Sequence, residues 1–297
     1  MMVFGLVVNI AFLLVVARIA EMRTLTNYYL ANLAIADMLF VASVGYHFGV
    51  SYLASPDVKL LLYHSSAGCA INVSIQFMSH FTSIALVFLV TLERYLGICK
   101  PFQHRVVATR RRTVILIILA WTFGAAYSCV LISPKWYRFT KICVVWPEGD
   151  EYAHYPTILT TCTPIHPFYN FIPDIVQTMY VKIIVQLRSR DMEFDNAVPQ
   201  ATDNTRRQQS SNIARLLIAN GVVFFICYLP YYINRLNDAI IVISNNRFGF
   251  QLTTSQRGVW DWSAIALTII NSIINPVIYG ISSPRYRKAF VQVFRCN

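Results

Sequence analysis

Seven long stretches of the chain consist mostly of apolar residues, and polar residues gather between them. A helix that crosses the hydrocarbon core of a bilayer needs about 20 such residues in a row. Prolines inside these stretches are tolerated where neighbouring groups satisfy the freed carbonyls. The pattern predicts an all-α membrane protein, a bundle of seven transmembrane helices within a single domain of 297 residues, at residues 1–20, 28–53, 67–99, 113–133, 162–187, 213–243 and 259–281.

The first stretch has a second interpretation, because only 17 residues precede Arg18. The run Ala17-Arg18-Ile19-Ala20 loosely resembles the cleavage site of a secretory signal peptide. However, the start has no basic region, and Asn9 interrupts the apolar run. We therefore expect a first transmembrane helix whose beginning is short or missing.

Residues 283–294 alternate basic and apolar side chains at helical spacing. A helix of this kind lies in the membrane interface, with its apolar face toward the acyl chains. We expect a short amphipathic eighth helix here. Cys296 follows it directly and is a candidate for palmitoylation.

The composition agrees with a membrane protein, since 56% of the residues are hydrophobic and 13% are charged. Soluble domains have about 25% charged residues and need them to stay dissolved. The net charge of +11 would suggest nucleic acid as the partner of a soluble protein. Here the Lys and Arg residues between the predicted spans number 17 on one side and 7 on the other. The positive-inside rule puts the larger set in the cytoplasm, so we expect the N-terminus outside, a plasma-membrane location, and no nucleic-acid partner.

Ionisable groups inside membrane spans are costly and usually functional. Asp37 lies deep in the second predicted span, and oxygen-bearing side chains occur at comparable depth in other spans. One interpretation is a hydrated pocket for a proton or Na⁺. The other is a hydrogen-bond network that joins the helices. The residues alone leave both open for this set, which is Asn9, Asp37, Ser83, Asn271, Ser272 and Asn275.

Two further motifs end predicted spans on the cytoplasmic side. Glu93-Arg94-Tyr95 ends the third span; its arginine can pair with the neighbouring acid, be released to a partner, or simply extend to the interface. Asn275-Pro276-Val277-Ile278-Tyr279 ends the seventh span. Its proline frees a backbone carbonyl that the asparagine can satisfy, and the kink creates a hinge.

Cys69 and Cys143 are expected on the outer, oxidising side, at the start of the third span and in the loop after the fourth. The compartment permits a disulfide between them, which would fix the loop over the extracellular mouth. The alternative is a pair of free thiols. The six histidines are too scattered to indicate a metal site.

Together, these motifs resemble the rhodopsin-type (class A) G-protein-coupled receptors over essentially the whole chain. Each motif is weak alone, but their joint order and spacing are specific; Arg94 follows Cys69 by 25 residues, as in the family. The residues that carry the resemblance are Asn9, Leu33 to Asp37, Cys69, Glu93 to Tyr95, Trp121, Pro173, Phe224, Cys227 to Pro230, Asn271, and Asn275 to Tyr279.

The resemblance implies roles for these residues. In the family, the pocket around Asp37 binds Na⁺ and favours the inactive state. Arg94 corresponds to the residue that meets a heterotrimeric G protein, and Tyr279 to the tyrosine that turns inward on activation. Ile84, Pro173 and Phe224 correspond to the packing switch below the ligand.

Three positions depart from the family pattern. Tyr228 stands where the family usually has tryptophan, so the toggle beneath the ligand is smaller and has a hydroxyl. Val181 stands where span five usually has tyrosine, with Tyr180 one residue earlier. Glu93 replaces the commoner aspartate, which is a mild change.

The ligand class follows partly by exclusion within the family. Amine receptors carry an aspartate where this chain has Gln76, and opsins carry a lysine in the seventh span, where residues 259–281 have none. The local sequences Met22 to Leu30, Thr109 to Arg112 and Pro230 to Leu236 resemble neuropeptide receptors of the neuromedin U, thyrotropin-releasing hormone and ghrelin group. That group uses an arginine at the position of Arg235 to bind the peptide. We expect a peptide ligand in a cavity lined by Gln76, Phe77, His80, Tyr231, Tyr232, Arg235 and Trp262, with His80 mainly packing on Tyr228.

Other classes fit less well. A transporter would commonly show paired, repeated hydropathy patterns, and none is visible. The chain has no HExxH, GxSxG or P-loop motif, so we do not expect an enzyme. A receptor-like protein that no longer signals stays an alternative, given the short first span and the altered switch positions. Coupling to Gq is an expectation from the resemblance alone.

Overall fold

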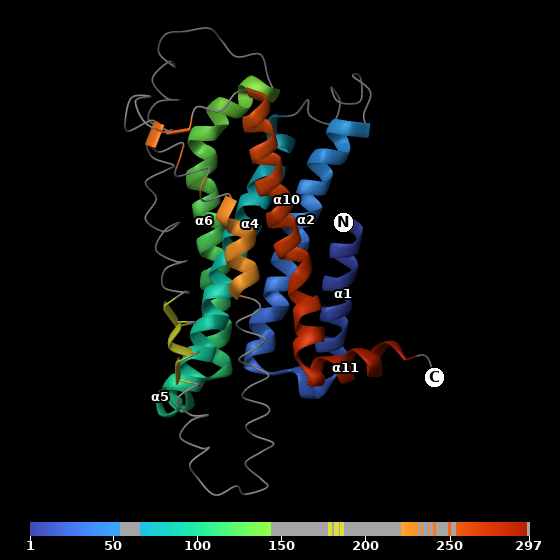
Figure 1. The fold of residues 1–297 in the computed structure, drawn as a ribbon, viewed down its shortest axis with the longest axis vertical. Helices are drawn as coiled ribbons and strands as arrows, with labels where there is room; N and C mark the ends of the chain where they lie inside the picture. The colour runs from blue at the N-terminus through green and yellow to red at the C-terminus, as the bar shows by residue number, and fades with distance from the viewer. Residues whose placement is uncertain are drawn as a thin grey trace, which may run out of the picture.

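The computed structural model describes residues 1–53, 66–143, 178–179, 181–183, 185–186, 221–230, 233, 237, 240–241, 249–250 and 254–295. Its helices run nearly parallel to the long axis of the molecule, except that α5 and α11 lie at one end and α11 extends sideways from the bundle (Figure 1). The elements are α1 (Met2–Arg18), the 3-10 turn η1 (Ala20–Met22), α2 (Leu25–Leu53), α4 (Ser66–Cys99), α5 (Pro101–Val107), α6 (Arg110–Cys143), α10 (Thr254–Ser282) and α11 (Pro284–Phe294).

Four helices of the described residues are long and apolar enough to cross a membrane. Their spanning parts are Leu25–Tyr46, Ile71–Cys99, Arg110–Cys129 and Ser263–Ile281. Helix α1 is also apolar but has only 17 residues. At a rise of about 1.5 Å per residue it is a little shorter than the hydrocarbon core.

The predicted spans and the helices agree least at α6. The expected span ended at residue 133, whereas α6 continues to Cys143, so Cys143 is the last residue of a helix and not part of a loop. The expected loop position of Cys143 was wrong, because charged residues such as Lys135 and Arg138 end an apolar window without ending a helix. The part of α6 that is apolar enough to cross a membrane ends at Cys129. The short helix α5 was not predicted.

The remaining predicted spans are tested unevenly. Most of 162–187 and 213–243 lies outside the described residues, within which Gly221–Pro230 is an apolar helix. Helix α11 begins and ends close to the expected amphipathic helix. Its position in the membrane interface stays a prediction.

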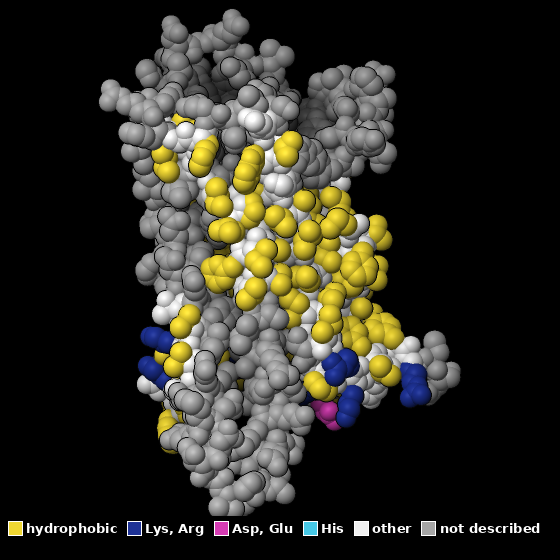
Figure 2. Space-filling view, viewed as in Figure 1, with side chains coloured by type: hydrophobic (Ala, Val, Ile, Leu, Met, Phe, Trp, Pro, Cys, Tyr) yellow, Lys and Arg dark blue, Asp and Glu magenta, His cyan; other side chains and the backbone are white. Residues whose placement is uncertain are grey.

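Helix α4 lies at the centre of the described bundle and packs along both α2 and α6. Its buried residues Phe81, Ile84 and Val87 recur at helical spacing and belong to one core cluster with Leu33 of α2 and Ile117 of α6. Apolar side chains also cover the outside of the bundle, where they form a broad band (Figure 2). An apolar exterior of this kind fits a lipid environment.

Basic side chains are placed differently from the apolar ones. In the same view, the Lys and Arg side chains drawn in blue lie near one end of the band, the end at which Figure 1 shows α5 and α11. This grouping agrees with the sequence, in which one set of loops carries more Lys and Arg residues than the other. It identifies the end that the positive-inside rule assigns to the cytoplasm.

Gly124 brings α6 and α4 into close contact. A Cβ atom at this position would lie 2.7 Å from the backbone carbonyl oxygen of Met78 and would overlap the hydroxyl of Thr82. Small residues allow helix backbones in membranes to approach in this way. The spacing between the two helices therefore depends on the missing side chain.

We predict that Gly124→Ala destabilises the protein, because the backbone of α4 must move to admit the methyl group. Overpacking of this kind costs about 1–3 kcal/mol, which corresponds to a fall of about 5 °C in Tm for a chain of this size. The measurement is thermal unfolding of the purified chain in detergent. Gly280→Ala is the matched control, since a Cβ atom there has nothing within 4 Å. An equal Tm for the two variants would contradict the close approach.

Candidate functional site

A buried carboxylate joins three helices in the middle of the bundle. Asp37 of α2 has no exposed surface. Its Oδ1 accepts a hydrogen bond from the hydroxyl of Ser83 on α4 at 3.0 Å, and its Oδ2 accepts one from Nδ2 of Asn275 on α10 at 2.8 Å. Ser272 of α10 is a further side-chain hydrogen-bond partner of Asp37, so the structure brings together four of the six residues expected at this pocket.

Asn9 adds the first helix to this region. Its Nδ2 donates to the carbonyl oxygens of Gly5, at 2.9 Å, and Ser272, at 3.1 Å. Its Oδ1 is fully buried and has no hydrogen-bond partner among the described residues. Asn271 and Ser272 are buried as well. Both interpretations from the sequence, an ion pocket and a helix-joining network, remain compatible with this arrangement.

The oxygen atoms at this site suit a small hard cation. A carboxylate, a hydroxyl and amide oxygens are the ligands that such ions prefer. The unpartnered Oδ1 of Asn9 supplies a buried acceptor that a bound cation or a water molecule would satisfy. Within the described part of the chain, no group of three His, Cys, Asp or Glu side chains could hold a transition metal.

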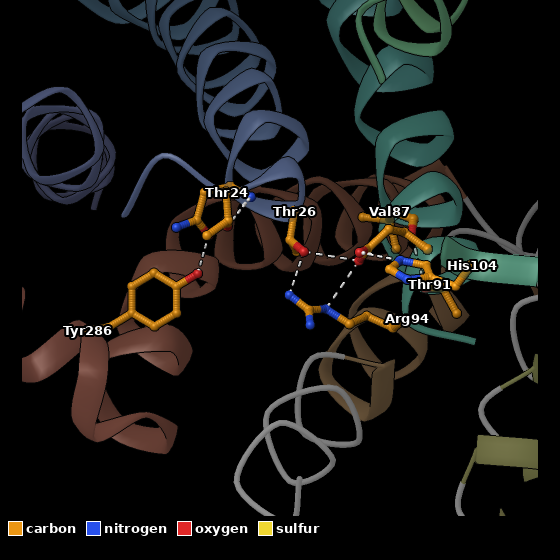
Figure 3. A network of polar contacts seen from close by, with 9 residues as sticks. Thr24, Thr26, Val87, Thr91, Arg94, His104 and Tyr286 are labelled. Carbon is orange, nitrogen blue, oxygen red and sulfur yellow. Dashed lines mark hydrogen bonds and ion pairs between the residues drawn. The ribbon is translucent and has the colours of Figure 1, made fainter. Parts of the chain in front are cut away.

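A second polar cluster lies at the C-terminal end of α4 (Figure 3). Nε of Arg94 lies 3.3 Å from Oε2 of Glu93. The hydroxyl of Thr26 on α2 accepts a hydrogen bond from Arg94 at 2.5 Å and donates one to Oε2 of Glu93 at 3.0 Å. Arg94 is therefore paired with its neighbouring acid and tied to α2 in this conformation, which is one of the alternatives that the sequence left open.

His104 is a further partner of Glu93. It lies on α5, and its Nε2 is 3.2 Å from Oε1 of Glu93. The two carboxylate oxygens of Glu93 therefore contact different groups, with Thr26 and Arg94 on one side and His104 on the other. Tyr95, the third residue of the motif, packs instead in a separate apolar cluster with Met179 and Ile183.

A third group of contacts joins α11 to the start of α2. The hydroxyl of Tyr286 donates to Oδ1 of Asn27, whose Nδ2 donates to the carbonyl oxygen of Met22 at 2.6 Å. Arg285 donates to the carbonyl oxygen of Glu21. Burial raises the pKa of Tyr286 to about 12, because the ionised phenolate would lose its hydration.

Buried aromatic rings contact one another within the bundle. Tyr228 is 2% exposed, and its ring centroid lies 4.5 Å from that of Phe224 and 5.5 Å from that of His80. His80 thus packs on Tyr228, as the sequence analysis expected. Ile84 is buried in the same core cluster. Tyr279 lies 5.4 Å from Phe12 and 5.7 Å from Tyr286, measured between ring centroids.

The expected ligand cavity is described only in part. Gln76 and Phe77 lie half-buried on α4, and His80 is buried below them. Pro173, Tyr231, Tyr232, Arg235 and Cys296 lie outside the described residues. Trp262, Cys69 and Cys143 lie in helices, but their side chains are also outside the description, so the ligand contacts, the disulfide and the palmitoylation stay predictions.

The comparisons with known proteins decide the family. Residues 8–279 match the family model of the seven-transmembrane receptors of the rhodopsin family. The chain belongs to this family. It is therefore an all-helical seven-transmembrane receptor and not an enzyme.

Individual relatives cover nearly all of the receptor. It is 27% identical to neuromedin-U receptor 2 of Mus musculus over 98% of this chain and 72% of that protein. It is 26% identical to somatostatin receptor type 2 of Mus musculus, over 98% of this chain and 74% of the relative. The neuromedin U receptor homolog nmur-2 of Caenorhabditis elegans is 27% identical over 96% and 75%.

Sequence reasoning missed several residues of the cytoplasmic cluster. Thr26 was not singled out, and His104 was considered only as one of several scattered histidines. A signal for His104 was present: Pro101 at the first turn of a helix just after the motif places His104 one turn further on, back toward Glu93. Thr26 has no comparable signal, because its contact with Arg94 joins residues 68 positions apart.

The raised pKa of Tyr286 predicts a pH dependence of stability. The group favours the folded state below pH 10, the pKa of an exposed tyrosine, and this contribution is lost as the pH rises toward 12. The Tm of the unmodified receptor should therefore approach that of Tyr286→Phe as the pH rises from 10 toward 12. Thermal unfolding of both proteins over this range tests it. A Tm difference that stays constant over this range would contradict the prediction.

Proposed function

We propose that the receptor binds an extracellular peptide and activates a heterotrimeric G protein at its cytoplasmic end. The observation that carries the proposal is the family match over residues 8–279. The peptide class is supported by relatives that are named receptors for neuromedin U and somatostatin. Gq is the G-protein class that we propose, on the resemblance to the neuromedin U group.

In the conformation described, Arg94 is restrained. It is bound to Glu93 and Thr26, and about a quarter of its side chain is exposed (26%). A partly exposed ion pair contributes about 0–1 kcal/mol, and a hydrogen bond to a charged group about 1.5–3 kcal/mol. The restraint therefore amounts to a few kcal/mol. An agonist favours the state in which Arg94 has left Glu93 and Thr26 if it binds that state more tightly. A preference of about a hundredfold would offset about half of this restraint or more.

On the extracellular side, we propose the seven residues predicted from the sequence as the ligand contacts. Arg235 and Gln76 offer forked hydrogen bonds to the carboxylate and amide groups of a peptide. Aromatic side chains, such as Tyr231 and Tyr232, offer contact area. His80 packs on Tyr228, which packs on Phe224, so a ligand resting on His80 would press on this aromatic pair.

Asp37, Ser83 and Asn275, together with Oδ1 of Asn9, would hold a sodium ion in the core. Bound there, the ion would supply a positive charge that compensates the buried carboxylate. In its absence, Asp37 keeps hydrogen bonds to α4 and α10 alone. Pro276 follows Asn275 within α10, so the bond from Asn275 to Asp37 also fixes the part of α10 next to the proline hinge.

We propose that the receptor lies in the plasma membrane with its N-terminus outside. The grouping of basic side chains near α5 and α11, the end where Arg94 also lies, supports this orientation. A palmitoyl group on Cys296 would attach the chain to the inner leaflet just after α11. A disulfide between Cys69 and Cys143 would join the outer ends of α4 and α6.

The signalling test uses cells that express the receptor and a library of neuropeptides. An active peptide should release calcium if the receptor couples to Gq, and cAMP is measured in parallel for other classes. Arg94→Ala should abolish the response but keep peptide binding, because Arg94 lies at the opposite end from the ligand. Arg235→Ala should weaken binding about tenfold to a hundredfold, the effect of removing a charged hydrogen-bond donor.

A control separates these effects from changes in expression. Arg112→Ala removes an exposed arginine from the cytoplasmic end of α6 and should respond normally at equal surface expression. Calcium release by Arg94→Ala would contradict its role in coupling. Silence with every peptide, despite surface expression, would favour a receptor-like protein that does not signal.

The sodium site has a test that does not depend on signalling. The Tm of the purified receptor should be higher in NaCl than in KCl of equal ionic strength, by about 3 °C if the ion contributes about 1 kcal/mol. Asp37→Asn should abolish this difference. Ser43→Ala, on the same helix, removes a hydroxyl that bonds only to the carbonyl oxygen of Phe40, at 2.9 Å, and should keep it. Equal Tm values in the two salts would mean that the polar cluster is only a helix-joining network.

A further inference from the structure

The contact between Tyr286 and Asn27 fixes the orientation of a buried amide. Tyr286 is 8% exposed and Asn27 is 3% exposed. The amide nitrogen of Asn27 donates to Met22, so its oxygen faces α11, where the hydroxyl of Tyr286 donates to it. Because a buried acceptor without its donor costs about 1–3 kcal/mol, this hydroxyl favours the position of α11 beside the first turn of α2.

Thr26, the residue before Asn27, contacts both members of the ion pair between Arg94 and Glu93, which we call the Arg94 pair. Its hydroxyl contacts both Arg94 and Glu93, at 2.5 and 3.0 Å. Two consecutive residues of the first turn of α2 therefore bind different parts of the molecule, α4 through Thr26 and α11 through Asn27 (Figure 3). A helical turn is stiff, so a displacement at one of these contacts is transmitted to the other.

The ring of Tyr286 has a separate attachment. Its centroid lies 5.7 Å from that of Tyr279 on α10 and 6.1 Å from that of Phe12 on α1. Tyr286 thus reaches the Asn275–Tyr279 motif with its ring and the Glu93–Arg94 pair, through Asn27 and Thr26, with its hydroxyl. Phenylalanine at this position would keep the first connection and lose the second.

We propose that Tyr286 is a positioning residue for Arg94, and that α11 and the Arg94 pair stabilise each other through Thr26 and Asn27. Such a coupling is reciprocal: loosening α11 weakens the restraint on Arg94, and breaking that restraint loosens α11. Its consequence for signalling rests on the proposed function, whereas the coupling itself does not. Release of α11 by a partner at the cytoplasmic face would then make Arg94 more accessible to the G protein.

The direct test is amide hydrogen exchange of residues 284–294 in the full chain, reconstituted in lipid nanodiscs. Thr26→Val keeps the shape of the side chain, removes the hydroxyl and has no contact with α11. It should accelerate exchange in α11 about fivefold, the factor that corresponds to one net hydrogen bond. Thr26→Ser, which restores a hydroxyl, should exchange at the original rate.

The control is a second hydrogen bond of α2 that lies outside this connection. Nε1 of Trp121 donates to Oδ1 of Asn32 at 3.1 Å, and Trp121→Phe removes it. This variant should leave exchange in α11 unchanged. Exchange in residues 114–129 of α6 reports whether Thr26→Val is folded. If α11 exchanges at the original rate in a folded Thr26→Val protein, the coupling is overturned.

The signalling arm is a double-mutant cycle on basal G-protein activation at equal surface expression. Thr26→Val and Tyr286→Phe should each raise basal activity about twofold to fivefold, and the double variant should rise less than the product of the two. If the basal activity of the double variant rises by the full product of the two single effects, or if Tyr286→Phe does not raise it, the role of Tyr286 in restraining Arg94 is overturned. If no form activates a G protein while Thr26→Val still accelerates exchange in α11, the proposed function fails and the coupling stands.

Discussion

The buried carboxylate of Asp37 is the constraint on which the rest of the described bundle depends. A charged or polar group in hydrocarbon is costly unless other groups of the protein bind it. Ser83 and Asn275 supply those bonds from α4 and α10. The three helices must therefore meet at one depth, and this registration determines which residues face each other above and below it.

Polar contacts matter here because apolar packing alone discriminates little between helix arrangements in a membrane. Lipid tails are as apolar as the side chains of Leu or Val, so a helix gains little by exchanging one for the other. Close backbone approaches, as at Gly124, and hydrogen bonds between helices, as between Trp121 and Asn32, supply the specificity instead. These contacts are few and local, which leaves the cytoplasmic end able to rearrange.

The cytoplasmic end shows how such a rearrangement can be controlled. Glu93 binds three groups from three different elements: Arg94 of its own helix, Thr26 of α2 and His104 of α5. If Arg94 moves away from Glu93, Thr26 and His104 can still bind the Glu93 carboxylate, so the carboxylate keeps hydrogen-bond partners. Tyr286 and Tyr279 extend the same connection to α10 and α11. The Glu93–Arg94 pair and the Asn275–Tyr279 motif are thus parts of one contact network in the described structure.

The sequence by itself predicted apolar spans, an asymmetry of basic residues between the loops, and the family, because hydropathy, charge and motif spacing are properties of the linear chain. It also identified Asp37, Ser83 and Asn275 as one set, since their depths in separate spans are comparable. It expected Cys143 in a loop, whereas α6 continues to that residue, because charged side chains end an apolar window but not a helix. Only the tertiary structure decided that Arg94 pairs with Glu93 and Thr26, that His104 returns to Glu93, and that the hydroxyl of Tyr286 meets Asn27. Those contacts join residues from different helices, and their distances depend on how the helices are rotated and spaced, which no periodicity along the chain encodes.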